Sequence, residues 1–274
     1  MSQGRRFTTM LAAGVWMALS AATATAQYTG MNDPATGETY HVELAGGIWK
    51  PTITALISSE SLGIPGTEIN LVDDLGIVDR KFSDLRAVLR LAKKHKLRAS
   101  FVPIKYAAES TLKRTIVFNG ISYNVGLPVN SSLDFKAWRF GYEYDFIYRD
   151  RGFIGFILEA KYTDITASLA SPFNDDFASA KAPVPAVGLI ARGYLAANVA
   201  LTGELTGIKL PGNIEKLDGN TGEYWDLDVY GTLNFTDNFG VQGGYRRLSV
   251  EYRVDEDFGD LKLKGFYVNG VVRF

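Results

Sequence analysis

The sequence has no cysteine and only two histidines among its 274 residues. The absence of cysteine excludes disulfides and thiolate metal sites. Lys and Arg number 29 against 30 Asp and Glu, a formal net charge of −1, and this balance gives no support for binding to nucleic acid. Beyond the first 26 residues, charged side chains interrupt every apolar run, so the sequence predicts no transmembrane helix there.

Residues 1–26 have the pattern of a secretory signal peptide. Arg5 and Arg6 provide the charged start, and Met10–Ala22 is an apolar run too short to span a bilayer. Ala24–Ala26 is a small-residue cleavage site. Because no cysteine follows the apolar run, a lipoprotein anchor is not expected, and the mature chain is predicted to begin at Gln27.

The remaining chain is long enough for one large β domain. We interpret the polar residues 27–40 as a short periplasmic leader and residues 41–274 as a single barrel domain. A membrane protein without transmembrane helices has to be a closed barrel, because lipid cannot satisfy the open edge of a sheet.

The last stretch, Lys262–Phe274, alternates strictly between two kinds of side chain. One face is apolar and ends in the C-terminal aromatic, whereas the other carries an Arg and an Asn, which predicts a strand between an oily and a polar neighbour. This pattern resembles the C-terminal signal strand of bacterial outer-membrane β-barrel proteins. The resemblance implies insertion by periplasmic chaperones and the barrel-assembly machinery, location in the outer membrane of a Gram-negative bacterium, and an insertion signal made of Phe266, Val268, Val272 and Phe274.

Similar alternation predicts an all-β, antiparallel up-and-down transmembrane β-barrel of about ten strands, with both termini in the periplasm. Eight strands is the alternative, if the region around Arg114–Asn130 is irregular or one weak strand pair does not span. The predicted strands are His41–Trp49, Ser83–Ala92, Lys96–Tyr106, Asp134–Tyr148, Phe153–Ser168, Ala186–Ala196, Val199–Leu210, Glu223–Phe235, Phe239–Val254 and Lys262–Phe274.

The stretch Trp138–Tyr148 places aromatic residues on one face and charged residues on the other. At ~3.3 Å per residue and a tilt near 40–45°, it covers roughly 23–25 Å of the membrane normal, which matches an outer-membrane apolar band. A soluble barrel with an internal ligand would place the aromatic residues inside instead. The C-terminal aromatic and the alternation of short turns with long loops favour the membrane barrel.

Several connections carry local signals. Pro51–Lys81 is the longest connection and is expected on the cell exterior, and Ser171–Pro185 is a further predicted loop. Asn119–Gly120 predicts a two-residue hairpin. Gly46–Gly47 is interpreted as a β-bulge that turns Trp49 outward.

The predicted inward positions hold eight cationic and eight anionic side chains. A small barrel has an interior only wide enough for side chains, and buried charges have to be paired and hydrogen-bonded. The set therefore indicates a salt-bridged polar lumen, and a narrow channel for small polar or ionic solutes is the alternative. The residues are Glu43, Asp84, Arg86, Arg90, Arg98, Arg139, Glu143, Asp145, Glu159, Lys161, Arg192, Glu204, Asp226, Asp228, Arg246 and Arg273.

Two acidic pairs, Asp73–Asp74 and Asp175–Asp176, lie in predicted outer loops. If they met above the barrel they could bind Ca²⁺, bridge lipopolysaccharide phosphates through cations, or activate water. Outer-membrane proteases and lipid deacylases need a histidine at that end, but His41 and His95 both belong to the predicted periplasmic end. We therefore expect no enzyme and no cofactor.

The first functional hypothesis is a structural or surface-interaction barrel whose outer loops contact lipopolysaccharide or an external partner. The second is the narrow porin-like channel, and the third is an outer-leaflet enzyme. Nucleic acid is not an expected partner, and the sequence does not predict the oligomeric state.

Overall fold

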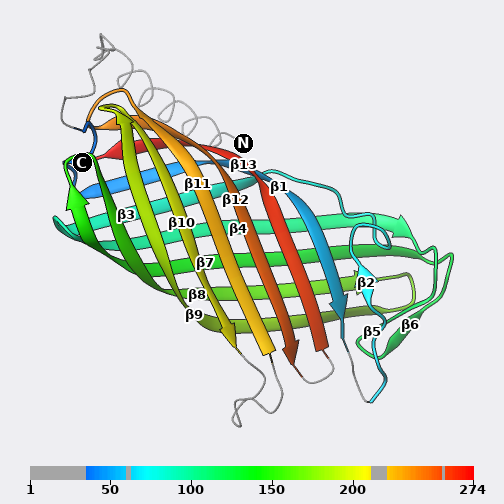
Figure 1. The fold of residues 1–274 in the computed structure, drawn as a ribbon. Helices are drawn as coiled ribbons and strands as arrows, with labels where there is room; N and C mark the ends of the chain where they lie inside the picture. The colour runs from blue at the N-terminus through cyan, green and yellow to red at the C-terminus, as the bar shows by residue number, and fades with distance from the viewer. Residues whose placement is uncertain (1–34, 60–62, 211–220, 255–256) are drawn as a thin grey trace, which may run out of the picture.

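Ten long strands form a closed antiparallel barrel, as the sequence predicts (Figure 1). The computed structural model describes residues 35–59, 63–210, 221–254 and 257–274; the predicted signal peptide and residues 27–34 of the predicted leader lie outside the described residues. Among the described residues, no helix is long and apolar enough to span a membrane. The barrel strands are β1 (Val42–Ser58), β3 (Phe82–Ala92), β4 (His95–Thr111), β7 (Pro128–Arg149), β8 (Gly152–Ala170), β9 (Asp175–Ala196), β10 (Val199–Leu210), β11 (Thr221–Asn234), β12 (Phe239–Val254) and β13 (Asp257–Arg273).

The barrel closes by antiparallel pairing of β13 with β1, which brings the C-terminus beside the start of the first strand (Figure 1). The backbone of Phe274 exchanges hydrogen bonds with Val42 at 2.9 and 3.0 Å. Short turns connect β3 to β4, β7 to β8, β9 to β10 and β11 to β12 at this same end, which we call the turn end. The opposite, loop end carries the longer connections.

Several strands extend further toward the loop end than the sequence predicts. β7 has 22 residues, or roughly 70 Å of strand and about 55 Å along the axis at a tilt near 40°, about twice the ~25 Å of an apolar band. The prediction of a loop at Ser171–Pro185 was wrong for most of that range, since β9 begins at Asp175. Pro183 and Pro185 are tolerated because the described ladder between β9 and β10 ends closer to the turn end, so these prolines pair with β8 alone.

An apolar belt surrounds the turn-end half of the barrel, where all ten strands expose large apolar side chains on their outer face. Such a continuous surface is unsuited to water and fits a bilayer, so the chain is a membrane barrel. Representative members, one from each strand in order, are Ile48, Leu89, Leu97, Phe140, Leu158, Leu189, Leu201, Leu227, Val241 and Val268.

The outward orientation predicted for Trp49 was wrong. The pairing of β1 with β13 runs without a register shift, so Gly46–Gly47 is not a bulge. Trp49 therefore faces the lumen with 1% of its surface exposed, and its indole N–H donates to the Gly265 carbonyl at 3.1 Å. Glycine is needed at position 47 because β1 and β13 approach each other closely there. A Cβ at Gly47 would lie 1.9 Å from the Val268 carbonyl oxygen.

The stripe Trp138–Tyr148 faces outward as far as Phe146, which is 45% exposed. A β-bulge between Tyr144 and Ile147 shifts the register with β8 and reverses the face of the residues that follow. Tyr148 consequently packs inside the barrel against the buried Phe153, with ring centroids 6.5 Å apart, and its predicted outward position was wrong.

Two connections at the loop end fold together over the lumen; we call residues 63–81 and 112–127 the loop plug. The predicted hairpin is confirmed as β5 (Ile116–Phe118) and β6 (Ile121–Tyr123), joined by Asn119 and Gly120 with φ of 48° and 80°. The first connection adds a short strand, β2 (Ile69–Asn70), paired with β1. Apolar side chains from both connections are buried in one core with inward-facing wall residues: Ile69, Leu71, Leu75, Ile77, Leu112, Ile116, Phe118 and Tyr123.

Candidate functional site

The lumen of the turn-end half holds a network of paired charges, and all sixteen side chains singled out in the sequence lie on its lumen side. Two further residues, Lys96 and Glu38, join them, so the described network has nine cations and nine anions. Each of the eighteen takes part in at least one ion pair within the network. These ion pairs involve residues from all ten barrel strands and one residue of the leader.

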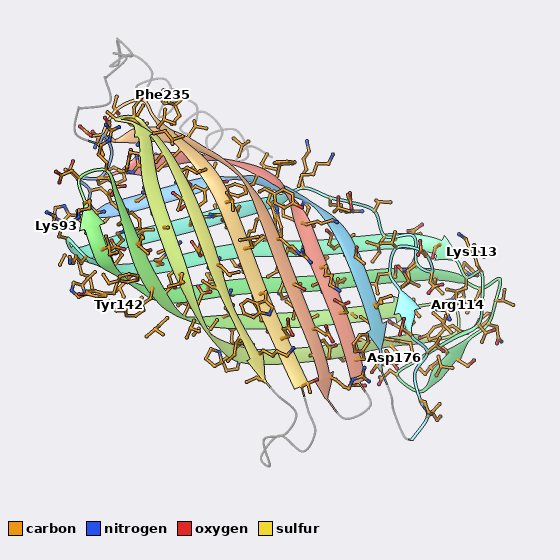
Figure 2. All side chains as sticks on the ribbon, in the orientation of Figure 1. Lys93, Lys113, Arg114, Tyr142, Asp176 and Phe235 are labelled. Carbon is orange, nitrogen blue, oxygen red and sulfur yellow. The ribbon has the colours of Figure 1, made fainter. Side chains whose placement is uncertain are left out.

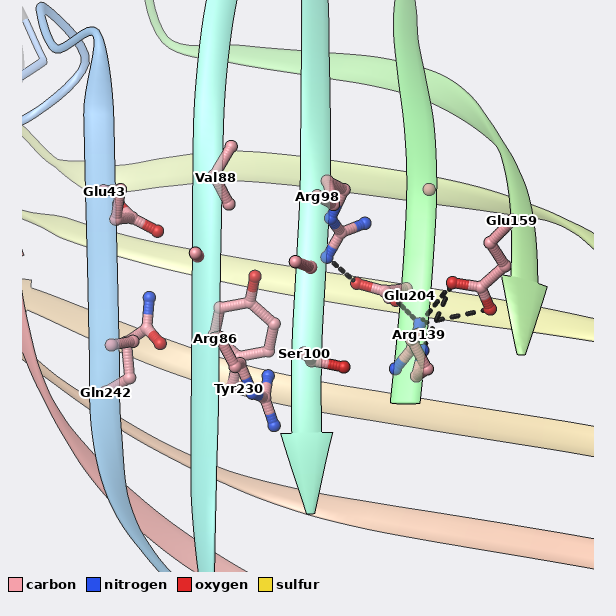
Figure 3. A pocket seen from close by; sticks show the side chains of 14 residues that line it. Glu43, Arg86, Val88, Arg98, Ser100, Arg139, Glu159, Glu204, Tyr230 and Gln242 are labelled. Carbon is pink, nitrogen blue, oxygen red and sulfur yellow. Dashed lines mark hydrogen bonds and ion pairs between the residues drawn. The ribbon is translucent and has the colours of Figure 1, made fainter. Parts of the chain in front are cut away.

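Arg139 is the centre of the network (Figure 3). Its guanidinium lies 2.6 Å from Glu204 and 3.0 Å from Glu159, the two contacts that Figure 3 draws. It also lies 3.1 Å from Asp226, and the three carboxylates belong to three different strands. Glu204 also accepts a hydrogen bond from Arg98 at 2.5 Å. A planar, five-donor group is suited to such a position, because it satisfies several buried carboxylates at once.

A second cluster surrounds Arg86. Its guanidinium lies 2.8 Å from Asp84 on the same strand and 2.7 Å from Asp228 across the lumen. The Tyr267 hydroxyl donates to Asp228 at 2.9 Å, and its ring centroid lies 4.5 Å from the Arg86 guanidinium carbon. The side-chain amide of Asn269 donates to Asp84 at 2.9 Å. Both carboxylates thus have neutral as well as charged partners, which buried ion pairs require.

Lys96 was missing from the sequence-based set. Its ammonium group lies 2.6 Å from Glu143 and 2.9 Å from Asp145, with the Phe153 ring centroid 3.6 Å away. Lys96 has the same parity as the predicted inward Arg98, which is a signal that the sequence contained. Because Lys96 stands at the start of the predicted strand, beside a turn, the alternation alone does not fix the face on which its side chain lies.

Glu38 was also missing, because it belongs to the predicted leader and not to a strand. The leader turns into the barrel mouth, and the Glu38 carboxylate lies 2.8 Å from both Arg192 and Arg90, which also donates to the Glu38 carbonyl. Tyr194 donates to the same carboxylate at 2.6 Å. Burial alone would raise the pKa of Glu38, but Arg192, Tyr194 and Arg90 outweigh it and lower the pKa to about 2.

The cavity within the network is small. It has a volume of about 40 Å³, and charged side chains, Tyr230 and Gln242 line it together with small residues such as Val88 and Ser100 (Figure 3). This space has room for only a few water molecules.

The loop plug is held by polar contacts at the loop end, where Figure 2 labels Arg114. The Arg114 guanidinium lies 2.7 Å from the Asp74 carboxylate, and this hydrogen bond lowers the pKa of Asp74. It joins the first connection to the second. The Thr67 N–H adds a backbone bond to the Val117 carbonyl at 2.9 Å.

The two acidic pairs have separate partners. Asp73 accepts a hydrogen bond from Asn70, whereas Asp176 accepts one from Asn119 at 2.9 Å. Within the described ranges, no group of three His, Asp or Glu side chains is placed to hold a metal ion. His95 lies at the turn end, where its ring contacts the Tyr142 hydroxyl at 2.5 Å.

A ring of exposed cations follows the apolar belt on its loop-end side; we call it the basic collar. Arg247 and Lys264 are direct partners in the pairing of β12 with β13, and each lies two residues beyond a belt aromatic, Tyr245 or Phe266. Like charges placed directly opposite each other repel. The exposed members of the collar are Lys50, Lys105, Lys136, Lys181, Lys209, Arg247 and Lys264.

A scan against protein-family models and a search of curated proteins each gave no match. Among solved structures, the outer-membrane protease OmpT of Escherichia coli superposes with a TM-score of 0.50 at 9% identity, covering 89% of this chain and 100% of that chain. The attachment invasion locus protein Ail of Yersinia pestis gives 0.33 at 8% identity (84% and 97% covered). The toluene transporter TodX of Pseudomonas putida gives 0.35 at 10% identity (92% and 98% covered). The chain therefore has the fold of outer-membrane β-barrel proteins.

Proposed function

We propose that the chain is an outer-membrane surface protein of a Gram-negative bacterium, closed to passive diffusion, whose loop end meets the exterior and the headgroups of the outer leaflet. The observation that supports closure is the filling of the lumen by two successive layers, the charge network and the apolar core beneath the loop plug. The equal numbers of opposite charges in the network favour pairing over an ion-selective pore. Binding is proposed rather than catalysis, because Asp74 and Asp176 at the loop end are already bonded to Arg114 and Asn119, and His95 lies at the other end.

Single-channel conductance in planar bilayers tests the closure. The mature protein, with folding verified by heat-modifiable gel mobility, is expected to give no steps at any salt concentration. Replacing residues 113–125 by two glycines, together with Arg139→Ala and Glu204→Ala, provides a positive control that removes one half of the plug and the centre of the network. The short link is feasible because Leu112 already donates to the Leu127 carbonyl at 3.0 Å. Stable ion-selective steps from the unmodified protein would instead establish the narrow channel.

Insertion is proposed to use the C-terminal strand and the barrel-assembly machinery. Phe266, Val268 and Phe274 expose 73%, 61% and 67% of their surface on the outer face of β13, and Val272 shares that face. Before β13 pairs with β1, these side chains lie on a strand at the free edge of the sheet, where the assembly machinery could bind them. Replacing Phe274 with Ser is expected to lower the amount of folded protein in the outer membrane while leaving spontaneous folding into detergent unchanged.

The basic collar supports lipopolysaccharide as the partner in the outer leaflet. Lys181 and Lys209 are paired with Asp164 at 3.2 Å and with Glu223 at 3.1 Å. Arg247 and Lys264, which face each other on β12 and β13, have no such acidic partner among the described residues. A phosphate bound between two facing cations would relieve their repulsion.

Replacing Arg247 and Lys264 together by Gln tests this contact. Each cation near an anionic surface contributes about 1 kcal/mol, so the affinity for lipopolysaccharide in detergent, measured by native mass spectrometry, is expected to fall about 30-fold. Lys93→Gln with Arg149→Gln removes the same charge from exposed positions at the turn end and is expected to change nothing. Equal losses of affinity in both double variants would show that only the net charge of the protein matters. This outcome would contradict the collar as a binding site.

A further inference from the structure

An apolar cavity of about 250 Å³ lies near the loop end and takes no part in the charge network. It lies between Phe118 of the loop plug and the inner wall of the barrel, and its walls come from β1, β7, β8, β9, β12 and β13. The side chains that matter for its chemistry are Ile57, Phe118, Leu133, Ile165, Val250 and Leu261.

The cavity is located beyond the apolar belt. Ile165 lies three residues past the exposed Tyr162 of β8, and Leu261 lies five residues before the exposed Phe266 of β13, both toward the loop end. Its walls are therefore backed by the part of the barrel that extends out of the bilayer. A molecule reaching it comes from the loop-end side and not through the charge network.

Its size and lining exclude several occupants. Water needs two to four polar partners to fill a cavity. Besides two aspartates, the polar side chains of the lining are Ser58, Ser59, Ser179 and Tyr252, and the rest of the lining is mainly aliphatic, so most of the wall favours an apolar occupant over water. An empty void of this volume is costly to a fold, because its walls lack dispersion contacts. An engineered apolar cavity of about 150 Å³ holds benzene, so this one has room for two fused rings or about ten carbon atoms.

The charged groups near the cavity also restrict the occupant. Asp257 and Asp260 are among the residues around it, and Lys262 lies 2.6 Å from the Asp260 carboxylate. A lining that carries carboxylates disfavours an anion, and its mainly apolar remainder favours an uncharged molecule over a charged one.

Glycine shapes one wall of the cavity. A Cβ at Gly259 would lie 2.3 Å from the Tyr252 ring, so only glycine allows this ring to lie across β13. With the ring in that position, both Tyr252 and Gly259 line the cavity instead of filling it.

We propose that this cavity is a binding site for a small, uncharged, apolar molecule of about ten carbon atoms, taken up from the loop end. The site goes beyond the proposed role as a closed surface barrel and does not depend on it. A conducting barrel would leave the cavity and its test intact, and failed binding would leave closure of the lumen unaffected.

Methyl NMR of the folded protein, labelled with ¹³C at the isoleucine δ1 positions and titrated with naphthalene, tests the site. Ile57 and Ile165 line the cavity. Ile48 and Ile154 face the lipid and report partition into the surrounding detergent, whereas Ile190 is buried in the turn-end cluster. Saturable shifts at the first two, with only linear drift at the lipid-facing pair and none at Ile190, are expected.

Blocking variants make the assignment specific. Ala178→Phe fills the cavity from β9 and is expected to abolish the saturable shifts, whereas Ala160→Phe adds the same ring on the exposed outer face of β8 and is expected to preserve them. If Ala178→Phe does not give a folded, heat-modifiable band, Gly259→Ala, which pushes the Tyr252 ring inward, takes its place. The anion 2-naphthalenesulfonate is expected to give no saturable shift. Equal linear shifts at all five isoleucines, or saturation that survives both blocking variants, would overturn the proposal.

Discussion

Arg273 and Glu43 lie directly opposite each other on the two strands that close the barrel, with the Arg273 Nε 2.6 Å from a Glu43 carboxylate oxygen. Both side chains are almost completely buried, and Arg273 also donates to the Asn234 side chain at 2.8 Å. This ion pair joins the first strand to the last across 230 residues of sequence. Its position means that the charge network contributes to closure of the barrel as well as to filling of the lumen.

Removing one partner of this pair is expected to be more harmful than removing both. Arg273→Met leaves the Glu43 carboxylate buried without its cation and is expected to cost about 3–5 kcal/mol, whereas Arg273→Met with Glu43→Leu is expected to cost less. Urea unfolding in lipid vesicles, followed by tryptophan fluorescence, measures both. Additive losses in the double variant would show that the two side chains do not interact energetically.

Neighbouring residues on β3 separate the lipid face from the lumen face. Leu89 is 42% exposed in the apolar belt, so Leu89→Arg is expected to cost roughly 2–4 kcal/mol and to impair insertion. Arg90→Leu instead removes one partner of Glu38 and is expected to loosen the leader without blocking insertion. Folding yields into vesicles compare the two variants, and equal yields would contradict the assigned faces.

Docking of the leader is expected to weaken in acid. The pKa of Glu38 is lowered from 4.5 to about 2, so its contribution to stability is fully present above pH 4.5 and is lost as the pH falls toward 2. The shift corresponds to about 3 kcal/mol at neutral pH. Glu38→Gln is therefore expected to be less stable than the unmodified protein at pH 7, with the difference shrinking near pH 2.

Urea unfolding at pH 7, 4 and 2.5 measures this difference. Glu109→Gln, at an exposed position on β4, is the matched control and is expected to follow the unmodified protein at every pH. A constant difference between Glu38→Gln and the unmodified protein across this range would exclude Glu38 as the titrating group.

Alternation of apolar and charged residues was sufficient to predict the ten strands and their two faces, because lipid on one side and a packed lumen on the other impose a period of two. The prediction failed where one residue changes the period, as at the bulge between Tyr144 and Ile147. It failed also for Trp49, because paired glycines fit a bulge and a close strand approach equally well. Neither distinction can be made without the partner strand.

Contacts between distant segments were the second limit. Glu38 joins the charge network only because the leader turns into the barrel mouth, and the loop plug exists only because residues near 70 meet residues near 118 inside the other end. The apolar side chains of the plug, such as Leu71 and Phe118, are visible in the sequence. Read in isolation, however, they look like ordinary residues of long surface loops.

The loop plug is expected to open independently of the barrel. Phe118 is 2% exposed in the core between plug and wall, so Phe118→Ala should destabilise the plug by about 3–5 kcal/mol. Because the barrel ladders do not include Phe118, urea unfolding of the barrel should change much less than local opening. Trypsin cleavage after Lys113 and Arg114, which lie beside the plug hairpin, is therefore expected to become at least tenfold faster in folded protein. Phe177→Ala removes an aromatic ring that is 62% exposed on β9; it serves as the control and should leave the cleavage rate unchanged. If trypsin cleaved Phe118→Ala no faster than the unmodified protein, the plug would not depend on this core.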